Sequence, residues 1–357
     1  MQAFSAADVI SPAIRRTRWF LFEPFRWSTF LKLCLVSLLT EGGSSGGNFN
    51  APRSHHSSSS SSVTTSTIPN ITAPHFGLSP LAIAASAAII VLLIGLAFVI
   101  AYLVTRLRFS LFHCLVSGTR EIRPGWRLYE AQSWRFFLLT VAVGFVFFFV
   151  MLLLAIPFIL GFYRLVQGAQ PGDPTNFAAI FALILPLIPI IILIVLLAFA
   201  VQIVLHDLML PHMALENASA GDAWRQVRVR IAAEKGGFLL FAFLRIVLPI
   251  AATIAAVIVL AIPAILVFLV VGAPAVWLST LTAGAVGLSK LLLVLLISLI
   301  VLVGVAIVVF LMLCIGGPIG IAVRNYALLF YGGRYQVLGD LLSPPPAPII
   351  EPTPQAL

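Results

Sequence analysis

Residues 291–323 read LLLVLLISLIVLVGVAIVVFLMLCIGGPIGIAV, a stretch without a single charged side chain. An α-helix needs about 20 apolar residues to cross the hydrocarbon core of a bilayer, so this stretch is more than long enough. Four other predominantly apolar stretches of this kind occupy residues 78–104, 136–163, 177–205 and 238–271. The sequence therefore predicts an all-α membrane protein, a polytopic helical bundle.

The composition excludes the main alternatives. Of the 357 residues, 61% are hydrophobic and only 9% are charged, whereas soluble domains average about 25% charged residues. The mean hydropathy is +1.11. No soluble fold removes so much apolar surface from water, which excludes soluble enzymes, secreted disulfide scaffolds and disordered chains. The three cysteines form no CxxC motif, so neither a disulfide framework nor a zinc site is predicted.

A sixth apolar stretch, residues 27–40, is short for a membrane span. At about 1.5 Å per residue it is shorter than the roughly 30 Å hydrocarbon core. The distribution of basic residues nevertheless favours a span. Several arginines precede this stretch, whereas Arg53 is the only Lys or Arg residue in residues 41–77. Basic segments stay on the cytoplasmic side. We therefore predict about six transmembrane helices, the first one short, in a bacterial inner (cytoplasmic) membrane with both termini cytoplasmic.

This topology divides the chain into five parts. Residues 1–27 form a cytoplasmic basic amphipathic segment, and residues 28–40 form the short first transmembrane helix. Residues 41–77, rich in Ser and Gly, form a disordered external loop, since such a composition cannot bury a core. Residues 78–342 form the main helical membrane domain, and residues 343–357 form a Pro-rich, disordered cytoplasmic tail.

Aromatic and basic residues gather in the segments predicted to be cytoplasmic. Ser219 and Asp222 have the spacing of a helix N-cap, and Trp224, Val227 and Ile231 then form an apolar stripe beside arginines. This pattern is typical of an amphipathic helix at the membrane surface. The residues predicted to lie at the lipid interface are Arg127, Trp134, Arg135, Trp224, Arg225, Arg228 and Arg230.

Charged residues are nearly absent from the predicted membrane helices. All twelve acidic residues fall outside them, and proton- or cation-coupled transporters usually need a carboxylate within the membrane. Arg245 lies within a predicted helix, about two turns from its cytoplasmic end. We interpret it as a side chain that reaches back to the interface, with anion binding as the alternative.

One polar cluster lies in the segment HDLMLPHMALE, residues 206–216. Imidazole and carboxylate groups are ligands that a divalent metal prefers, and His212 and Glu216 share a helix face. The segment does not match HExxH, and polar residues also belong where a helix leaves the bilayer. We therefore expect no metal and no cofactor. The predicted polar site consists of His206, Asp207, His212, Glu216 and Arg245.

Three stretches resemble a known group of proteins. These are FSAADVISPAIRRTRWFLFEPFRWSTFLKLCLVSLL (4–39), HDLMLPHMALENASAGDAWRQV (206–227) and YALLFYGGRYQVL (326–338). They resemble an uncharacterised group of bacterial multi-helix membrane proteins, and are distantly similar to the membrane domain found beside some glycerophosphodiester phosphodiesterases. The resemblance implies an integral inner-membrane protein and adds no catalytic residue.

The predicted function follows from what the sequence lacks. GxSxG, P-loop and paired-carboxylate motifs are absent. We therefore predict a non-enzymatic scaffold or accessory protein that contacts membrane lipids or a protein partner, with no nucleic-acid partner. A transporter or flippase-like protein for a lipid or uncharged solute, using the Pro-kinked helices, Gln202 and Arg245, is the alternative. A membrane-embedded hydrolase or metal enzyme at His206, Asp207, His212 and Glu216 is a third hypothesis.

Small residues predict close helix contacts without naming the partner helix. Gly304 and the pair Gly316–Gly317 lie within the last apolar stretch. Glycines let helix backbones approach closely in a membrane. The oligomeric state stays open at this stage.

Overall fold

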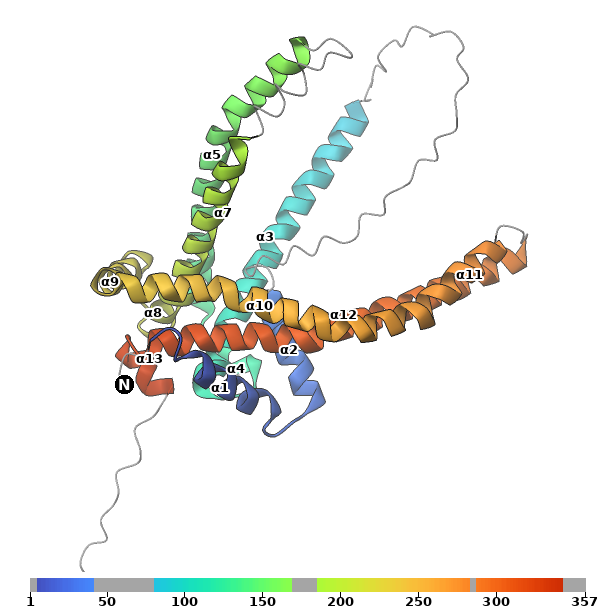
Figure 1. Ribbon diagram of the computed structural model, residues 1–357. Coiled ribbons are helices and arrows are strands. Elements are labelled where there is room, and N and C mark those ends of the chain that lie inside the picture. The colour runs from blue at the N-terminus through green and yellow to red at the C-terminus, as the bar shows by residue number, and fades with distance from the viewer. Residues whose placement is uncertain (1–4, 42–79, 169–184, 283–286, 343–357) are drawn as a thin grey trace, which may run out of the picture.

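The computed structural model describes residues 5–41, 80–168, 185–282 and 287–342, and every regular element in them is helical (Figure 1). The predicted all-α class is confirmed for these residues. All of the predicted external loop except Glu41, and the predicted tail, lie outside the described residues. The elements are α1 (Ile10–Phe22), α2 (Trp27–Glu41), α3 (Pro80–Ser117), α4 (Ile122–Leu128), α5 (Glu130–Gly168), α7 (Leu187–Ile203), η1 (Val204–Met209), α8 (Leu210–Leu215), α9 (Ala220–Ala233), α10 (Lys235–Val267), η2 (Phe268–Gly272), α11 (Ala273–Thr282), α12 (Leu288–Gly332) and α13 (Gln336–Leu342).

Five helical segments in the described part are long and apolar enough to cross a membrane. They are Ala84–Ser117, Glu130–Leu165, Leu187–Leu215, Lys235–Thr280 and Leu288–Gly332. The chain is thus a multi-pass membrane protein by the length and composition of its helices. The predicted short first span corresponds to α2, whose 15 residues rise about 22 Å. A sixth crossing through α2 stays a prediction.

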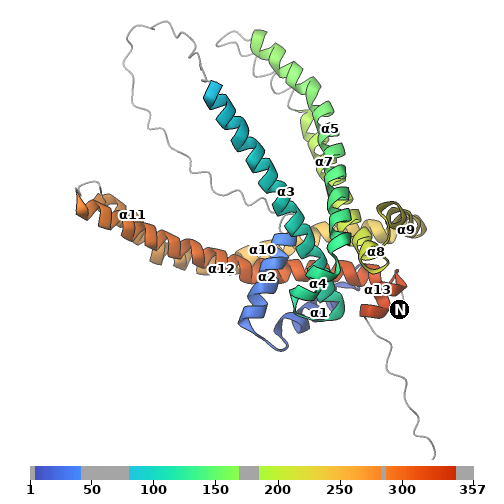
Figure 2. The ribbon, with the colours of Figure 1, turned by 180° about the vertical axis from the view of Figure 1, so that it is seen from behind.

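The long helices meet in a compact region and then diverge (Figures 1 and 2). We call this region the base; it contains α1, α2, α4, α8, α9, α13 and the adjoining ends of the long helices. We call the outer parts of the long helices the arms: α3, α5 with α7, and α10–α11 with α12. The arms expose apolar side chains such as Val91, Leu153 and Leu193. Exposed apolar surface of this extent is typical of contact with lipid.

The base contains the buried core. Its largest fully buried side chains include aromatic rings from several long helices. Phe241 of α10 stacks on Phe330 of α12, with ring centroids 4.3 Å apart and planes at 5°. Phe109 of α3 meets Phe136 of α5 edge to face at 5.6 Å. Aromatic pairs therefore join α10 to α12 within one arm and α3 to α5 between two arms.

Helices α3 and α12 extend into segments that were predicted to lie outside the membrane spans. Helix α3 continues to Ser117, past the predicted end at residue 104, and α12 continues to Gly332, past residue 323. Apolar residues at helical spacing continue into these segments. Phe109 and Phe112 are fully buried in the first. The hydrophobic pattern of the base therefore prolongs both helices through segments that charge counting places in loops.

The glycines of α12 mark its close contacts. A Cβ atom added at Gly304 would lie 2.6 Å from Cγ1 of Val271 in η2. One added at Gly317 would lie 2.6 Å from Cα of Cys34 in α2. Both distances are far below ordinary van der Waals contact. The glycines predicted to allow close packing therefore face η2 and α2.

We predict that Gly317→Ala lowers the stability of the protein by about 1–3 kcal/mol, because the new methyl group overpacks the contact between α2 and α12. Gly144→Ala is the matched control, since nothing lies within 4 Å of a Cβ atom at that position of α5. Thermal unfolding of the full chain in detergent measures both variants. Equal melting temperatures for the two would contradict the packing at Gly317.

Candidate functional site

A network of charged side chains lies buried in the base. Its members come from five elements that are far apart in sequence. We call it the charge cluster, and it consists of Glu41 (α2), Arg108 (α3), His206 and Asp207 (η1), Arg245 (α10) and Arg324 (α12). All but His206 are at most 9% exposed. Charges buried to this degree are costly unless they are paired.

Asp207 is the centre of the charge cluster. Arg245 donates from Nε to Asp207 Oδ2 at 2.8 Å, and Arg324 donates from Nη1 to Oδ1 at 2.9 Å. Arg324 Nη1 also donates to the carbonyl oxygen of His206 at 2.8 Å. Both carboxylate oxygens of Asp207 thus accept from guanidinium groups. Asp207 thereby ties η1 to α10 and α12.

Glu41 joins α2 to the same arginines. Arg245 donates from Nη2 to Glu41 Oε2 at 3.0 Å, and Arg324 Nη1 lies 3.9 Å from Oε1. Burial by itself would raise the pKa of Glu41, but the positive charges of Arg324, Arg245 and Arg108 outweigh it and hold this pKa below its ordinary value. Glu41 is therefore a carboxylate in the folded protein.

Arg108 has a different set of partners. Its Nη2 donates to the carbonyl oxygen of Thr40 at 2.5 Å, and its Nη1 lies 2.5 Å from Nδ1 and 2.9 Å from Nε2 of His206. A ring nitrogen that faces a guanidinium must accept, so His206 is neutral here. Arg108 makes no ion pair with any residue that the structure describes. Three guanidinium groups thus meet two carboxylates, and one positive charge is in excess.

The helix is locally distorted where it presents His206 and Asp207. Both residues lie in η1, a π-helical segment between α7 and α8. Pro211 follows in the first turn of α8 and has no N–H to donate to the Asp207 carbonyl, four residues earlier. That missing bond favours the wider π-turn, a distortion frequently found at functional sites. The sequence HDLMLP thus positions the two polar side chains.

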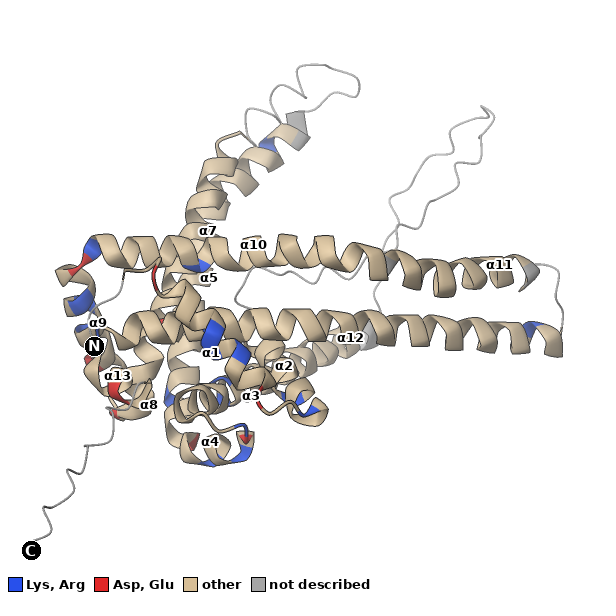
Figure 3. Cartoon of the chain, turned by 60° about the horizontal axis from the view of Figure 1, so that its bottom comes forward, with Lys and Arg blue, Asp and Glu red and all other residues tan. Residues whose placement is uncertain are grey.

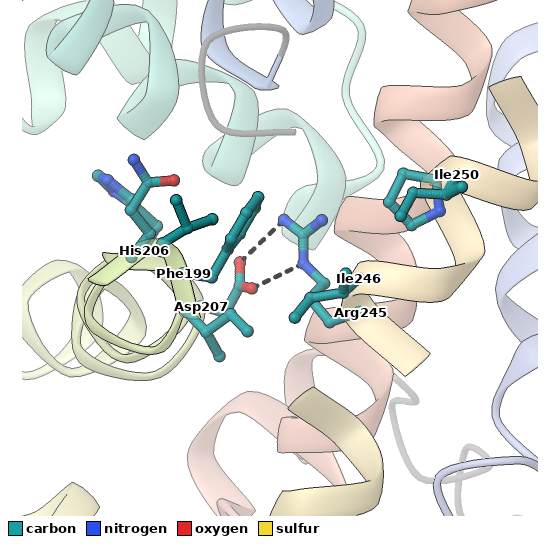
Figure 4. Close-up of a pocket in the computed structure, with 10 residues that line it drawn as sticks. Phe199, His206, Asp207, Arg245, Ile246 and Ile250 are labelled. Atoms are coloured by element: carbon teal, nitrogen blue, oxygen red, sulfur yellow. Dashed lines mark hydrogen bonds and ion pairs between the residues drawn. The ribbon is translucent and has the colours of Figure 1, made fainter. Parts of the chain in front are cut away.

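A cavity of about 360 Å³ opens beside the charge cluster, between α7 and α10 (Figure 4). Asp207 and Arg245 point toward each other at its polar end, and Gln202 and His206 also line it. The remaining walls are apolar, formed by Val195, Phe199, Ile203, Ile246, Pro249 and Ile250. The cavity is therefore amphipathic: its polar end lies in the base, and its apolar end lies toward the arms.

The predicted polar site is divided in the structure. His206, Asp207 and Arg245 belong to the charge cluster. His212 and Glu216 face each other one helical turn apart, with Nδ1 and Oε2 3.5 Å apart, as their spacing predicts. They belong to a second network, in which His212 Nε2 lies 2.7 Å from the Tyr331 hydroxyl and Tyr335 donates to Glu216 Oε1 at 2.7 Å.

No group of three His, Cys, Asp or Glu side chains is placed to hold a metal ion within the described residues. The four residues of the metal-enzyme hypothesis are split between the two networks. That hypothesis therefore has no assembled ligand set in this part of the chain.

Two expectations about charges are wrong. Arg245 does not reach back to the interface, because its guanidinium is bound within the base by Asp207 and Glu41. Asp207 is not outside the apolar helices, since it lies within the segment Leu187–Leu215. Sequence reasoning also missed Arg108 and Arg324, which it counted as loop charges. Their apolar neighbours at helical spacing are the signal that could have revealed them.

Most of the predicted lipid-interface residues are exposed on the base, where Lys and Arg gather (Figure 3). Ser219 caps α9 by accepting from the Asp222 N–H at 3.2 Å, as its spacing predicts. Trp224, Arg225 and Arg228 are exposed on α9, whereas Val227 is fully buried. Arg230 differs from the others, because it lies over the ring of Tyr335 and contacts His212.

Comparison with known proteins gives a match to a family model. The chain belongs to DUF7544, a family of unknown function. The match covers residues 4–341 and so includes the three stretches that resemble uncharacterised membrane proteins. No curated protein and no solved structure matches the chain. The comparisons give no link to the membrane domain of glycerophosphodiester phosphodiesterases.

We predict that Asp207→Asn destabilises this DUF7544 member by about 3–5 kcal/mol, because removing one partner leaves buried arginines without compensation. Asp222→Asn is the matched control. It also replaces a carboxylate by a carboxamide, but in an exposed ion pair, in which Asp222 is 54% and Arg225 76% exposed. Exposed ion pairs contribute little to stability. Thermal unfolding in detergent checks both; an Asp207→Asn protein as stable as the control would contradict the role of the charge cluster.

A further ion pair joins the end of α9 to the residues that follow α12. Arg334 donates from Nε and Nη2 to the two carboxylate oxygens of Glu234, at 2.6 and 2.7 Å. Glu234 ends α9, and Arg334 follows α12. The hydrogen bonds from Arg334, and then its charge, lower the pKa of Glu234 below 4.5.

We predict a pH-dependent contribution from this pair. Because the folded-state pKa of Glu234 is lowered, its stabilisation is complete above the unfolded value of 4.5 and is lost as the pH falls through the folded value. Glu234→Gln should therefore destabilise the protein at pH 7 and make progressively less difference as the pH falls below 4.5. Glu121→Gln, at an exposed carboxylate without an ion pair in the described residues, is the control. Thermal unfolding across this pH range measures the difference.

Proposed function

We propose that the protein is a non-enzymatic scaffold or accessory component of the bacterial inner membrane, with both termini in the cytoplasm. Its base contacts anionic lipid headgroups. One observation carries this proposal: α9 holds an exposed face with Trp224, Arg225 and Arg228 on the same base from which the apolar arms extend.

The packing of α9 supports the proposal. Ala223 and Val227 are fully buried against the base, so the opposite face of the helix is held outward. Arginines near a membrane surface gain about 1 kcal/mol each from anionic lipids, and tryptophan is enriched at the interface. A rigid basic and aromatic face beside apolar arms is suited to the headgroup region. A protein partner with an acidic surface is the competing occupant.

We predict that Arg225→Gln with Arg228→Gln lowers retention of anionic lipid by the purified full chain. Nanodiscs of equal phosphatidylglycerol and phosphatidylcholine serve as the source, and mass spectrometry measures the ratio of the two lipids after mild delipidation. About 1 kcal/mol per arginine corresponds to a roughly fivefold change for each.

Arg164→Gln with Lys290→Gln is the control, because it removes the same charge from exposed positions outside the base. Equal loss of phosphatidylglycerol in both double variants would contradict a specific role of α9. If the variant with Arg225→Gln and Arg228→Gln keeps its lipid ratio but no longer co-purifies with a stoichiometric protein partner from native membranes, the exposed face of α9 binds a protein and not lipid.

A transporter or flippase-like function is the second candidate. The observation that favours it is the cavity between α7 and α10, which is lined by Gln202, Arg245 and Pro249. Transporters place their sites beside interrupted helices, and Pro249 lies inside α10. Translocation of a fluorescent lipid analogue in proteoliposomes, compared with protein-free vesicles, tests this function.

A further inference from the structure

The cavity beside the charge cluster has two chemically different ends. On α7 and η1, its lining residues Val195, Phe199, Gln202 and His206 follow one helix face. They extend over about 16 Å at 1.5 Å per residue. Ile250 and Arg245 bound the cavity on the α10 side. Both helices thus present apolar side chains toward the arms and polar side chains toward the base.

The charge cluster beside the polar end carries an excess of positive charge. Within the described residues the charge cluster holds three arginines and two carboxylates, and Arg108 has only His206 and the Thr40 carbonyl as partners. Arg108 is 8% exposed and makes no direct ion pair in the described residues, while the two carboxylates of the cluster are shared among three arginines; a buried positive charge in excess is unfavourable. An anion at the polar end would neutralise this excess.

Donors for such an anion are present in the cavity wall. Arg245 uses Nε and Nη2 for Asp207 and Glu41, and its Nη1 makes no hydrogen bond to a residue that the structure describes. Gln202, one helical turn before His206, also lines the cavity and carries a carboxamide donor. A carboxylate or phosphate can accept from both groups. The geometry therefore provides charge and hydrogen-bond donors together.

We propose that this cavity binds a single-chain anionic amphiphile, with its carboxylate or phosphate beside Arg245 and Gln202 and its acyl chain along Phe199 and Ile250. A free phosphate would leave the apolar walls without a partner, and a neutral lipid would leave the positive charge uncompensated. The cavity volume is in the range of small-ligand sites and suits one chain. The inference concerns binding only, and depends neither on the lipid contacts of α9 nor on transport.

The test uses the full chain in phosphatidylcholine nanodiscs, titrated calorimetrically with dodecyl phosphate and referenced to empty nanodiscs. We expect saturable binding near one ligand per chain. Ile250→Trp fills the apolar side of the cavity without touching the charge cluster, and should weaken binding at least tenfold. Ile254→Trp, one turn farther along α10 at a residue that is 57% exposed and outside the cavity lining, should leave binding unchanged within twofold.

Two further ligands separate the sources of affinity. Dodecanol carries the same chain without charge, and inorganic phosphate carries the charge without a chain; each should bind at least tenfold more weakly than dodecyl phosphate. Arg108→Gln, which removes the excess charge, should also weaken the binding of dodecyl phosphate. Equal binding by Ile250→Trp and Ile254→Trp, binding of dodecanol as tight as that of dodecyl phosphate, or tight binding of inorganic phosphate would overturn the proposal.

Discussion

The carboxylate of Asp207, held between the guanidinium groups of Arg245 and Arg324, is the interaction on which the rest of the architecture depends. It connects η1, α10 and α12, and Arg245 extends the connection to Glu41 at the end of α2. Buried charges are tolerated only when they are paired and hydrogen-bonded, so this network specifies how the helices meet. The aromatic pairs around it then fill the base.

The base and the arms are stabilised in different ways. In the base, rings such as Phe241 and Phe330 are fully buried, and packing within the protein removes them from solvent. Along the arms, apolar side chains are exposed, and only a hydrocarbon surrounding satisfies them. The long helices are therefore predominantly apolar, and they are buried in protein at one end only. Close glycine contacts, as at Gly304 with Val271, hold the α12 arm as a pair of helices.

The proposals for function share one chemical preference. The exposed face of α9 combines arginine with tryptophan, and the cavity combines an excess guanidinium charge with apolar walls. Each pairing favours a molecule that is anionic at one end and apolar elsewhere. In a membrane, lipids are the abundant molecules of this kind. The two regions nevertheless differ, because the face of α9 is open and Arg245 at the cavity is committed to buried ion pairs.

Much of this protein follows from the sequence alone. The long apolar stretches determine an all-α membrane protein, because an uninterrupted run of about 20 apolar residues satisfies its backbone groups in hydrocarbon as a helix, whereas a barrel strand is shorter and alternates with polar residues. The cap of α9 at Ser219 and the shared face of His212 and Glu216 follow from spacing, since one helical turn brings such residues together. These features are local, and local patterns report them.

Only the tertiary structure shows which charged residues form the charge cluster. Glu41, Arg108 and Arg324 each resemble a charge at the end of an apolar stretch, and charge counting places such residues in loops. Their burial depends on one another, because each charge is stable inside the base only when the others lie beside it. Partners this distant in sequence leave no local pattern. The sequence thus determined which helices are long and apolar enough to cross a membrane, and the tertiary structure decided which charges they bury together.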